Sequence, residues 1–198
     1  MESPFEKILK DLYPQGKKIG QEIVGEAKIV FETPFVGVAG VTLKEDSVRV
    51  FDIILAQPGV GALVITDDEK VILVQNTRIG AQTFNWEIPQ ETVELKEIPE
   101  KTVKRALTEE LGYSSDVISM TPLPFRIHAA PHRFTEVTQV FLTRIASYKQ
   151  TNKIDTKEIH AIKAYPLDTI EELIKNGVVT ESVTLVSLHW LLLHKDLL

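Results

Sequence analysis

Glutamates gather at the end of one predicted helix, where their carboxylates could hold a divalent cation. Glu109 and Glu110 are adjacent, Arg105 lies one turn before Glu109, and Glu97 lies upstream of the helix. Neighbouring carboxylates repel each other, so packing alone gives little reason for the cluster. Oxygen-rich clusters of this kind suit Mg²⁺ or Mn²⁺. The residue types therefore indicate a metal site.

The helix that carries these residues is predicted over residues 99–111. Pro99 is a favoured first helical residue, and Gly112 is a typical residue just past a helix end. An apolar stripe recurs at i, i+4 and i+8 and consists of Val103, Leu107 and Leu111. The preceding segment, residues 86–98, reads as an acid-rich loop.

The stretch from Trp86 to Tyr113 resembles the signature of the Nudix hydrolases. That signature is G, five residues, E, seven residues, then R-E-hydrophobic-x-E-E-x-G-hydrophobic. Counting from Glu91, the positions in register are Glu97, Arg105, Leu107, Glu109, Glu110, Gly112 and Tyr113. Glu87-Ile88-Pro89 resembles the E-L-P of the ADP-ribose pyrophosphatase branch. The resemblance extends over roughly residues 27–195.

Two positions depart from the signature and make this a degenerate Nudix box. Glu91 stands where the family has glycine, and Ala106 stands where it has a glutamate that usually binds metal. Positions 106, 109 and 110 share one helical face, so this chain offers two carboxylates there instead of three. Glu91 either reshapes its loop, because glycine permits backbone angles that glutamate resists, or points at the metal site and partly replaces the missing carboxylate.

The resemblance implies an α+β fold: a Nudix α/β/α sandwich with a mixed sheet, preceded by a small N-terminal antiparallel sheet. The residue pattern agrees, with a short helix over 3–12, two or three strands within 25–59 and a hairpin over 60–78. We expect residues 1–57 to form a dimerisation region and residues 58–198 to form the Nudix domain. A sheet this small buries little by itself, so a homodimer is physically reasonable.

The implied activity is metal-dependent hydrolysis of a nucleoside diphosphate derivative, ADP-ribose or a related nucleotide sugar, with impaired turnover. Mg²⁺ or Mn²⁺ would be held by Glu109, Glu110 and the backbone carbonyl of Gln90. Glu97 and Arg105 would orient the helix glutamates. Either Asp155 or Glu158 would assist the metal or the water, and the sequence does not choose between them. The alternative is a non-catalytic Nudix module that binds a nucleotide or acts as a scaffold.

Four residues are candidates for substrate binding. Arg78 ends a segment similar to the family's Q-Y-R, and Glu87 belongs to the E-L-P-like run. Arg133 and Glu136 lie in a loop that resembles the family's S-P-G-x-x-x-E segment. A guanidinium binds phosphate oxygens through two parallel bonds. The alternatives are a surface salt bridge for Arg78 and simple solvation for Arg133.

The composition of the chain narrows the classes of protein and of binding partner that remain possible. The 198 residues are 43% hydrophobic and 25% charged, which is ordinary for a globular protein. No apolar run reaches the roughly 18 residues that span a bilayer, so we expect no membrane partner. The net charge of −6 and the lack of a basic patch argue against nucleic acid. The absence of cysteine excludes disulfides and thiolate zinc sites and fits a cytoplasmic protein.

Overall fold

The computed structural model describes residues 3–115, 117–154 and 157–197. The chain divides into two compact units, and each is described by itself. The first unit comprises Met1–Pro58 and His128–Val137, and the second comprises Gly59–Ile127 and Thr138–Leu198. The boundary predicted after residue 57 stays a prediction. No helix in the described part of the chain is long and apolar enough to cross a membrane.

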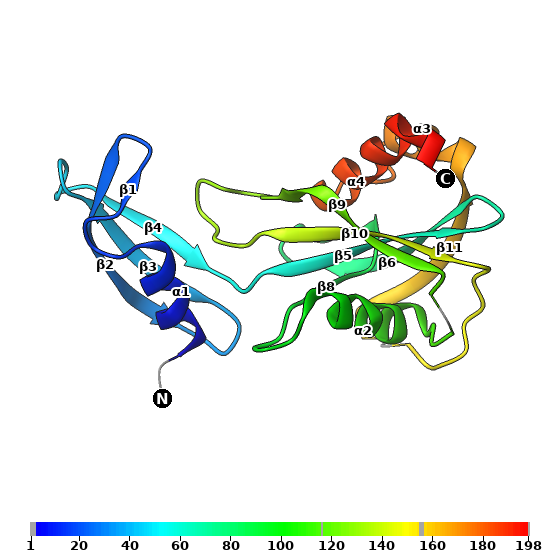
Figure 1. Ribbon diagram of the computed structural model, residues 1–198, viewed down its shortest axis with the longest axis horizontal. Coiled ribbons are helices and arrows are strands. Elements are labelled where there is room, and N and C mark those ends of the chain that lie inside the picture. Colours follow the sequence, from blue (N-terminus) through cyan, green and yellow to red (C-terminus); the bar gives the residue numbers. More distant parts are fainter. Residues whose placement is uncertain (1–2, 116, 155–156, 198) are drawn as a thin grey trace. The chain divides into compact units, whose positions relative to one another are not determined.

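The first unit is a small antiparallel sheet with one helix packed on it (Figure 1). Its elements are α1 (Pro4–Leu12), β1 (Lys18–Ile19), β2 (Glu22–Glu32), β3 (Gly37–Leu43) and β4 (Val50–Leu55). Phe5 and Leu9 of α1 are buried against Ala39 and Leu55 of the sheet. Residues 128–137 join this unit through backbone bonds, since Ile54 N–H donates to the carbonyl of Arg133 at 2.7 Å.

The second unit is built on a mixed sheet with the strand order β11-β6-β5-β10-β9, where β7 pairs with β6 and β8 with β5. Its strands are β5 (Gly59–Thr66), β6 (Lys70–Arg78), β7 (Thr83–Glu87), β8 (Gln90–Thr92), β9 (Ser119–Ile127), β10 (Thr138–Ile145) and β11 (Ile159–Pro166). Its helices are α2 (Pro99–Leu111), α3 (Ile170–Lys175) and α4 (Ser182–Leu193), with 3₁₀ turns η1 (Leu167–Thr169) and η2 (Lys195–Leu197). Strands β5 and β10 are parallel, whereas the other pairs are antiparallel.

Alternating side chains of β5 form two separate cores, one on each face of this sheet. Val60, Ala62 and Val64 pack with Val103, Leu107 and Leu111 of α2. Leu63 and Ile65 pack on the other face with side chains of α3 and α4. Figure 1 shows α2 on one side of the sheet and α3 and α4 on the other. The predicted α+β class is confirmed, with its helix-covered mixed sheet and its separate small antiparallel sheet.

Candidate active site

The C-terminal part of α2, the strands β6 and β8 and the start of β11 line a pocket of about 130 Å³ in the second unit. Its lining residues are Asn76, Arg78, Gln90, Glu91, Glu109, Glu110, Glu158 and Ile159. Five predicted site residues, which lie up to 80 positions apart in sequence, thus share one cavity: Arg78, Gln90, Glu109, Glu110 and Glu158. The roles assigned to them stay predictions. Asp155, the alternative to Glu158, lies outside the described residues.

Glu110 is the most unusual group of this pocket. Its Oε1 accepts a hydrogen bond from Gln90 N–H at 3.0 Å, whereas its Oε2 is buried with no partner among the described residues. Burial raises the pKa of the Glu110 carboxyl from 4.5 to about 8, against the opposing effect of the Gln90 bond. A buried carboxylate with one unsatisfied oxygen is costly unless a cation or a donor reaches it.

Arg105 ties α2 to the loop that precedes it. Its Nη2 pairs with Glu97 Oε2 at 2.9 Å and donates to the carbonyl of Thr92 at 2.8 Å. Its Nη1 lies 3.0 Å from Glu91 Oε2 and 3.9 Å from Glu109 Oε2. The hydrogen bond from Arg105 lowers the pKa of Glu97 to about 2, and the same bond raises the pKa of Arg105. The guanidinium therefore fixes the position of the loop and reaches toward the pocket.

Arg78 and Glu87, both predicted to bind substrate, bind each other. Arg78 Nε lies 3.0 Å from each oxygen of Glu87, and Nη2 also contacts Oε2 closely. The hydrogen bond to Glu87 raises the pKa of Arg78. The side chain of Glu87 is fully buried, so this pair is not the surface salt bridge considered as the alternative. Glu87 thus holds the guanidinium of Arg78 at the wall of the pocket.

Arg133 and Glu136 belong to the first unit. Arg133 Nη1 donates to the carbonyl of Asp52 at 3.1 Å, within that unit. The substrate contacts predicted for Arg133 and Glu136 stay predictions.

The sequence analysis missed two residues of this region. Asn76 is only 5% exposed, lines the pocket, and has a buried Oδ1 without a partner in the described chain. The available signal was a polar residue that follows the apolar run VILV in a strand, where asparagine is disfavoured. Glu181 caps α4 and accepts from Gln90 Nε2 at 3.0 Å, which orients the Gln90 side chain.

The donor set fits a divalent cation by its chemistry. Carboxylate oxygens are hard ligands that Mg²⁺ and Mn²⁺ prefer, and the unpartnered Oε2 of Glu110 has the lone pairs to bind one. Among the described residues, however, no group of three acidic or imidazole side chains is already arranged around a single point. Ala106, where the family has a ligand, is fully buried. The exposed side chains of Glu109 and Glu158 would have to move to complete a coordination sphere.

Gly112 joins the end of α2 to the segment that follows β10. Its φ of 61° is left-handed, and its carbonyl accepts from the N–H groups of Thr151 and Asn152 at 2.9 Å each. A Cβ at this position would lie 2.4 Å from the carbonyl oxygen of Asn152. Tyr148 reinforces this junction by donating to the carbonyl of Leu111 at 2.8 Å. The glutamates of α2 therefore have a fixed backbone anchor.

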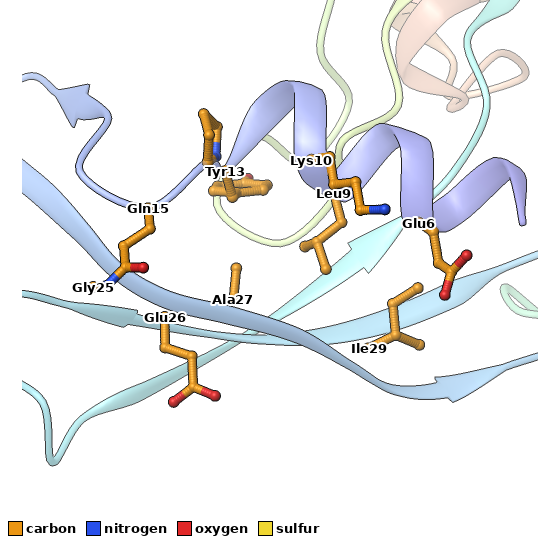
Figure 2. Close-up of a pocket in the computed structure, with 10 residues that line it drawn as sticks. Glu6, Leu9, Lys10, Tyr13, Gln15, Gly25, Glu26, Ala27 and Ile29 are labelled. Atoms are coloured by element: carbon orange, nitrogen blue, oxygen red, sulfur yellow. The ribbon is translucent and has the colours of Figure 1, made fainter. Parts of the chain in front are cut away.

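A second hollow, of about 740 Å³, lies between α1 and β2 in the first unit (Figure 2). Leu9 points from the helix toward the sheet, where Ala27 and Ile29 face it. The carboxylate of Glu26, which also lines the hollow, points away from the helix. The smaller acidic pocket is therefore the better candidate for chemistry.

Comparison with known proteins is consistent with this geometry. The model of the NUDIX domain matches residues 55–184. The ADP-ribose pyrophosphatase of Bacillus subtilis (strain 168) is 27% identical over 146 residues, which cover 73% of this chain and 77% of that protein. The methanol dehydrogenase activator of Bacillus methanolicus is 25% identical over the same shares. The crystal structure of an ADP compounds hydrolase has a TM-score of 0.71 at 17% identity and covers 88% of this chain and 96% of its own, which shows a shared fold.

Proposed function

The chain belongs to the NUDIX domain family, and from this premise we propose that it hydrolyses a nucleoside diphosphate derivative, ADP-ribose or a related nucleotide sugar, with impaired activity. The similarity to an ADP-ribose pyrophosphatase supports this substrate class. The expected impairment follows from Ala106, since α2 presents two carboxylates where the family signature has three.

One observation carries the proposal: the buried, unpartnered Oε2 of Glu110 in a pocket that Arg78 also lines. A carboxyl group held out of water in this way can release its proton to a bound cation, which then lies beside the carboxylate. Arg78, fixed by Glu87, presents a guanidinium to the same cavity, where it can bind a phosphate oxygen. A cation and an arginine in one pocket can together bind the oxygens of a diphosphate.

In this proposal Glu109, Glu110 and the backbone carbonyl of Gln90 hold Mg²⁺ or Mn²⁺. The bound cation would neutralise the diphosphate and lower the pKa of a water molecule. Arg105 and Glu97 keep α2 and its loop in position. Glu158, which is exposed at the edge of the pocket, takes the proton of the attacking water. Water attack on phosphorus breaks the P–O–P bridge and gives two phosphomonoesters.

The test is turnover of ADP-ribose with Mn²⁺ or Mg²⁺, followed as phosphate released from the products by a phosphomonoesterase. We expect slow turnover by the natural chain that is lost in Glu110→Gln. Turnover that survives Glu110→Gln would contradict the proposed site. If the natural chain turns over ADP-ribose as expected, a thermal-shift panel of nucleoside diphosphate derivatives would identify the substrate within the class.

A second candidate function is a non-catalytic module that binds nucleotide or acts as a scaffold. The burial of Ala106 and the incomplete convergence of carboxylates favour it. A relative named as an activator of another enzyme also agrees with it. Under this alternative the natural chain binds nucleotides without turnover, and Ala106→Glu creates activity. Turnover by the natural chain would exclude it.

We also propose that the first unit forms a homodimer interface. Val30, Phe31 and Val50 are 55–59% exposed. A Cβ at Gly40 would meet Val30 and Val50, whereas the adjacent Ala39 packs under α1, so the two valines lie on the sheet face opposite the helix. Light scattering coupled to size exclusion should give the mass of a dimer, and Phe31→Glu with Val50→Glu should give a monomer. The cytoplasmic location and the lack of a nucleic-acid partner stay predictions.

A further inference from the structure

We propose that Glu91 supplies the third carboxylate of the cation site, from strand β8, in place of the one that α2 lacks at Ala106. This inference rests on the proposed function, because it concerns the same pocket. It differs from that function by assigning a metal-binding role to a residue at which this chain departs from the family signature.

The backbone of Glu91 needs no glycine. Glu91 lies in the β5–β8 ladder opposite Val60, and the left-handed non-glycine residues in the described chain are Glu69, Gln82 and Lys96. The loop is therefore not strained by the glutamate, and the side chain is directed by regular strand geometry. It is 24% exposed and lines the pocket together with Glu109 and Glu110.

Existing contacts fix the Glu91 carboxylate but do not use all of the acceptor capacity of its oxygens. Its Oε1 accepts from the N–H of Thr92 at 2.9 Å, and its Oε2 pairs with Arg105 Nη1 at 3.0 Å. Each carboxylate oxygen can accept more than one bond, so both retain the capacity to bind a cation. The same Nη1 lies 3.9 Å from Glu109, so the two carboxylates are neighbours around one nitrogen.

Two buried oxygens that line the pocket can each accept a bond from a positive group. Asn76 Oδ1 and Glu110 Oε2 are both buried acceptors without a partner among the described residues. Asn76 is 5% exposed and lines the same cavity. Four glutamates line the pocket and Arg78 is the positive side chain among its lining residues. A divalent cation beside Glu110 Oε2 would satisfy that oxygen and offset this negative charge.

Helix α2 does not offer an equivalent group, since Ala106 is fully buried and has no polar atom in its side chain. Glu91 lines the pocket from a different element, the strand β8. The cation would then be held between β8 and α2 and would link the sheet to the helix.

The experiment is titration of the full chain with Mn²⁺, in which electron paramagnetic resonance measures the free ion. Glu91→Gln keeps the shape of the side chain and an acceptor for Arg105 but removes the charge. We expect it to weaken Mn²⁺ binding at least about tenfold, because even partners beyond the ligands contribute about that much. Glu94→Gln is the matched control: Glu94 is 72% exposed, lies 4.0 Å from Arg105 Nη2 and does not line the pocket. It should bind Mn²⁺ like the natural chain.

A restoration experiment separates binding of the cation from support of Arg105. Adding Ala106→Glu to Glu91→Gln should recover most of the Mn²⁺ affinity, whereas a role limited to holding Arg105 would not be restored from position 106. Circular dichroism confirms that the variants fold. If the double variant is unfolded because position 106 is buried, Glu91→Gln is made in an Arg105→Gln chain instead. A role limited to holding Arg105 then predicts no further loss of Mn²⁺ affinity, whereas a ligand role predicts the same loss as in the natural chain.

The outcomes distinguish this inference from the function on which it rests. Mn²⁺ binding that is unchanged in Glu91→Gln but lost in Glu110→Gln would overturn the role of Glu91 and leave the proposed function standing. A natural chain that neither binds Mn²⁺ nor turns over ADP-ribose would overturn both.

Discussion

Two glutamates near α2 are held in opposite ways: Glu97, in the loop outside the pocket lining (the rim), and Glu110, which lines the pocket (the floor). At the rim, Glu97 is bonded by Arg105, and its pKa falls to about 2. On the floor, Glu110 has one backbone donor and one oxygen without a partner, and burial raises its pKa to about 8. These two residues lie 13 positions apart in the sequence and are the same amino acid, so the difference comes from their surroundings.

The contrast separates an acid that is fixed by an ion pair from one that has an oxygen open to a ligand. A carboxylate that is paired with a guanidinium stabilises the folded protein without any ligand. A buried carboxylate without a partner for one oxygen destabilises the folded protein when no cation is bound. Binding of a cation to that oxygen then stabilises the folded protein.

The largest effect is expected from Glu110→Gln. Loss of the floor carboxylate should reduce ADP-ribose turnover more than about 100-fold, since removing even a group behind a metal ligand costs 10- to 100-fold. The measurement is the initial rate at saturating Mn²⁺, with Glu94→Gln as the control. A loss no greater than that of the control would remove the distinction between floor and rim.

A second test concerns the matched pair beside the floor, Arg78 and Glu87. Arg78→Ala leaves the buried Glu87 without its cation and should lower the free energy of unfolding by about 2 kcal/mol, reduced from the value for a fully buried pair because Arg78 is 39% exposed. Urea denaturation measures it. Adding Glu87→Gln should recover part of the loss. If Arg78→Ala were neutral, the pair would be only a surface contact.

A third test uses pH. Because folding raises the pKa of Glu110 from 4.5 to about 8, the folded state holds a proton that the unfolded state releases between these values. The stability from this group is complete below about pH 4.5 and declines by roughly 1.4 kcal/mol per pH unit until about pH 8. Without metal, the unfolding free energy of the natural chain should therefore fall relative to Glu110→Gln across this window.

The same pH series of unfolding free energies can be measured with added Mn²⁺. The cation needs the ionised carboxylate, so its stabilising effect should grow as pH rises through the window. A metal-free pH profile that is identical in the natural chain and in Glu110→Gln would show that Glu110 titrates normally.

The smallest effect is expected at the rim. Folding lowers the pKa of Glu97 to about 2, so its contribution to stability is present above pH 4.5 and is lost as pH falls toward 2. Glu97→Gln should shift the urea midpoint slightly downward at pH 6, and this difference should shrink at pH 3. A difference that grows in acid would contradict the sign of this shift.

Much of the fold could be predicted because local signals mark its elements. Pro99, the apolar stripe and Gly112 placed a helix at residues 99–111, and α2 has these bounds. The hairpin over 60–78 is also present, as β5 and β6. The sequence could not show that Glu181 binds Gln90 from 91 positions away, since such a contact depends on how β8 and α4 pack.

The candidate site divides in the same way. The signature nominates Glu97, Arg105, Glu109 and Glu110, because their spacing is set by one helix and its loop, and their roles stay predictions. It did not reveal Asn76, nor that Glu87 is the partner of Arg78, since these depend on the register between β6 and β7. It left two readings of Glu91 open, and the regular ladder around that residue removes the reason to invoke a reshaped loop.

Gly112 limits how this sequence can evolve. Even alanine would drive a methyl group into the carbonyl of Asn152, and the displaced backbone belongs both to the helix of Glu109 and Glu110 and to the segment that leads toward Glu158. One such mutation would therefore displace the end of α2 and the segment around Asn152 together. The sequence departs from the family signature at Glu91 and Ala106, whereas the backbone junction at Gly112 has no room for a side chain.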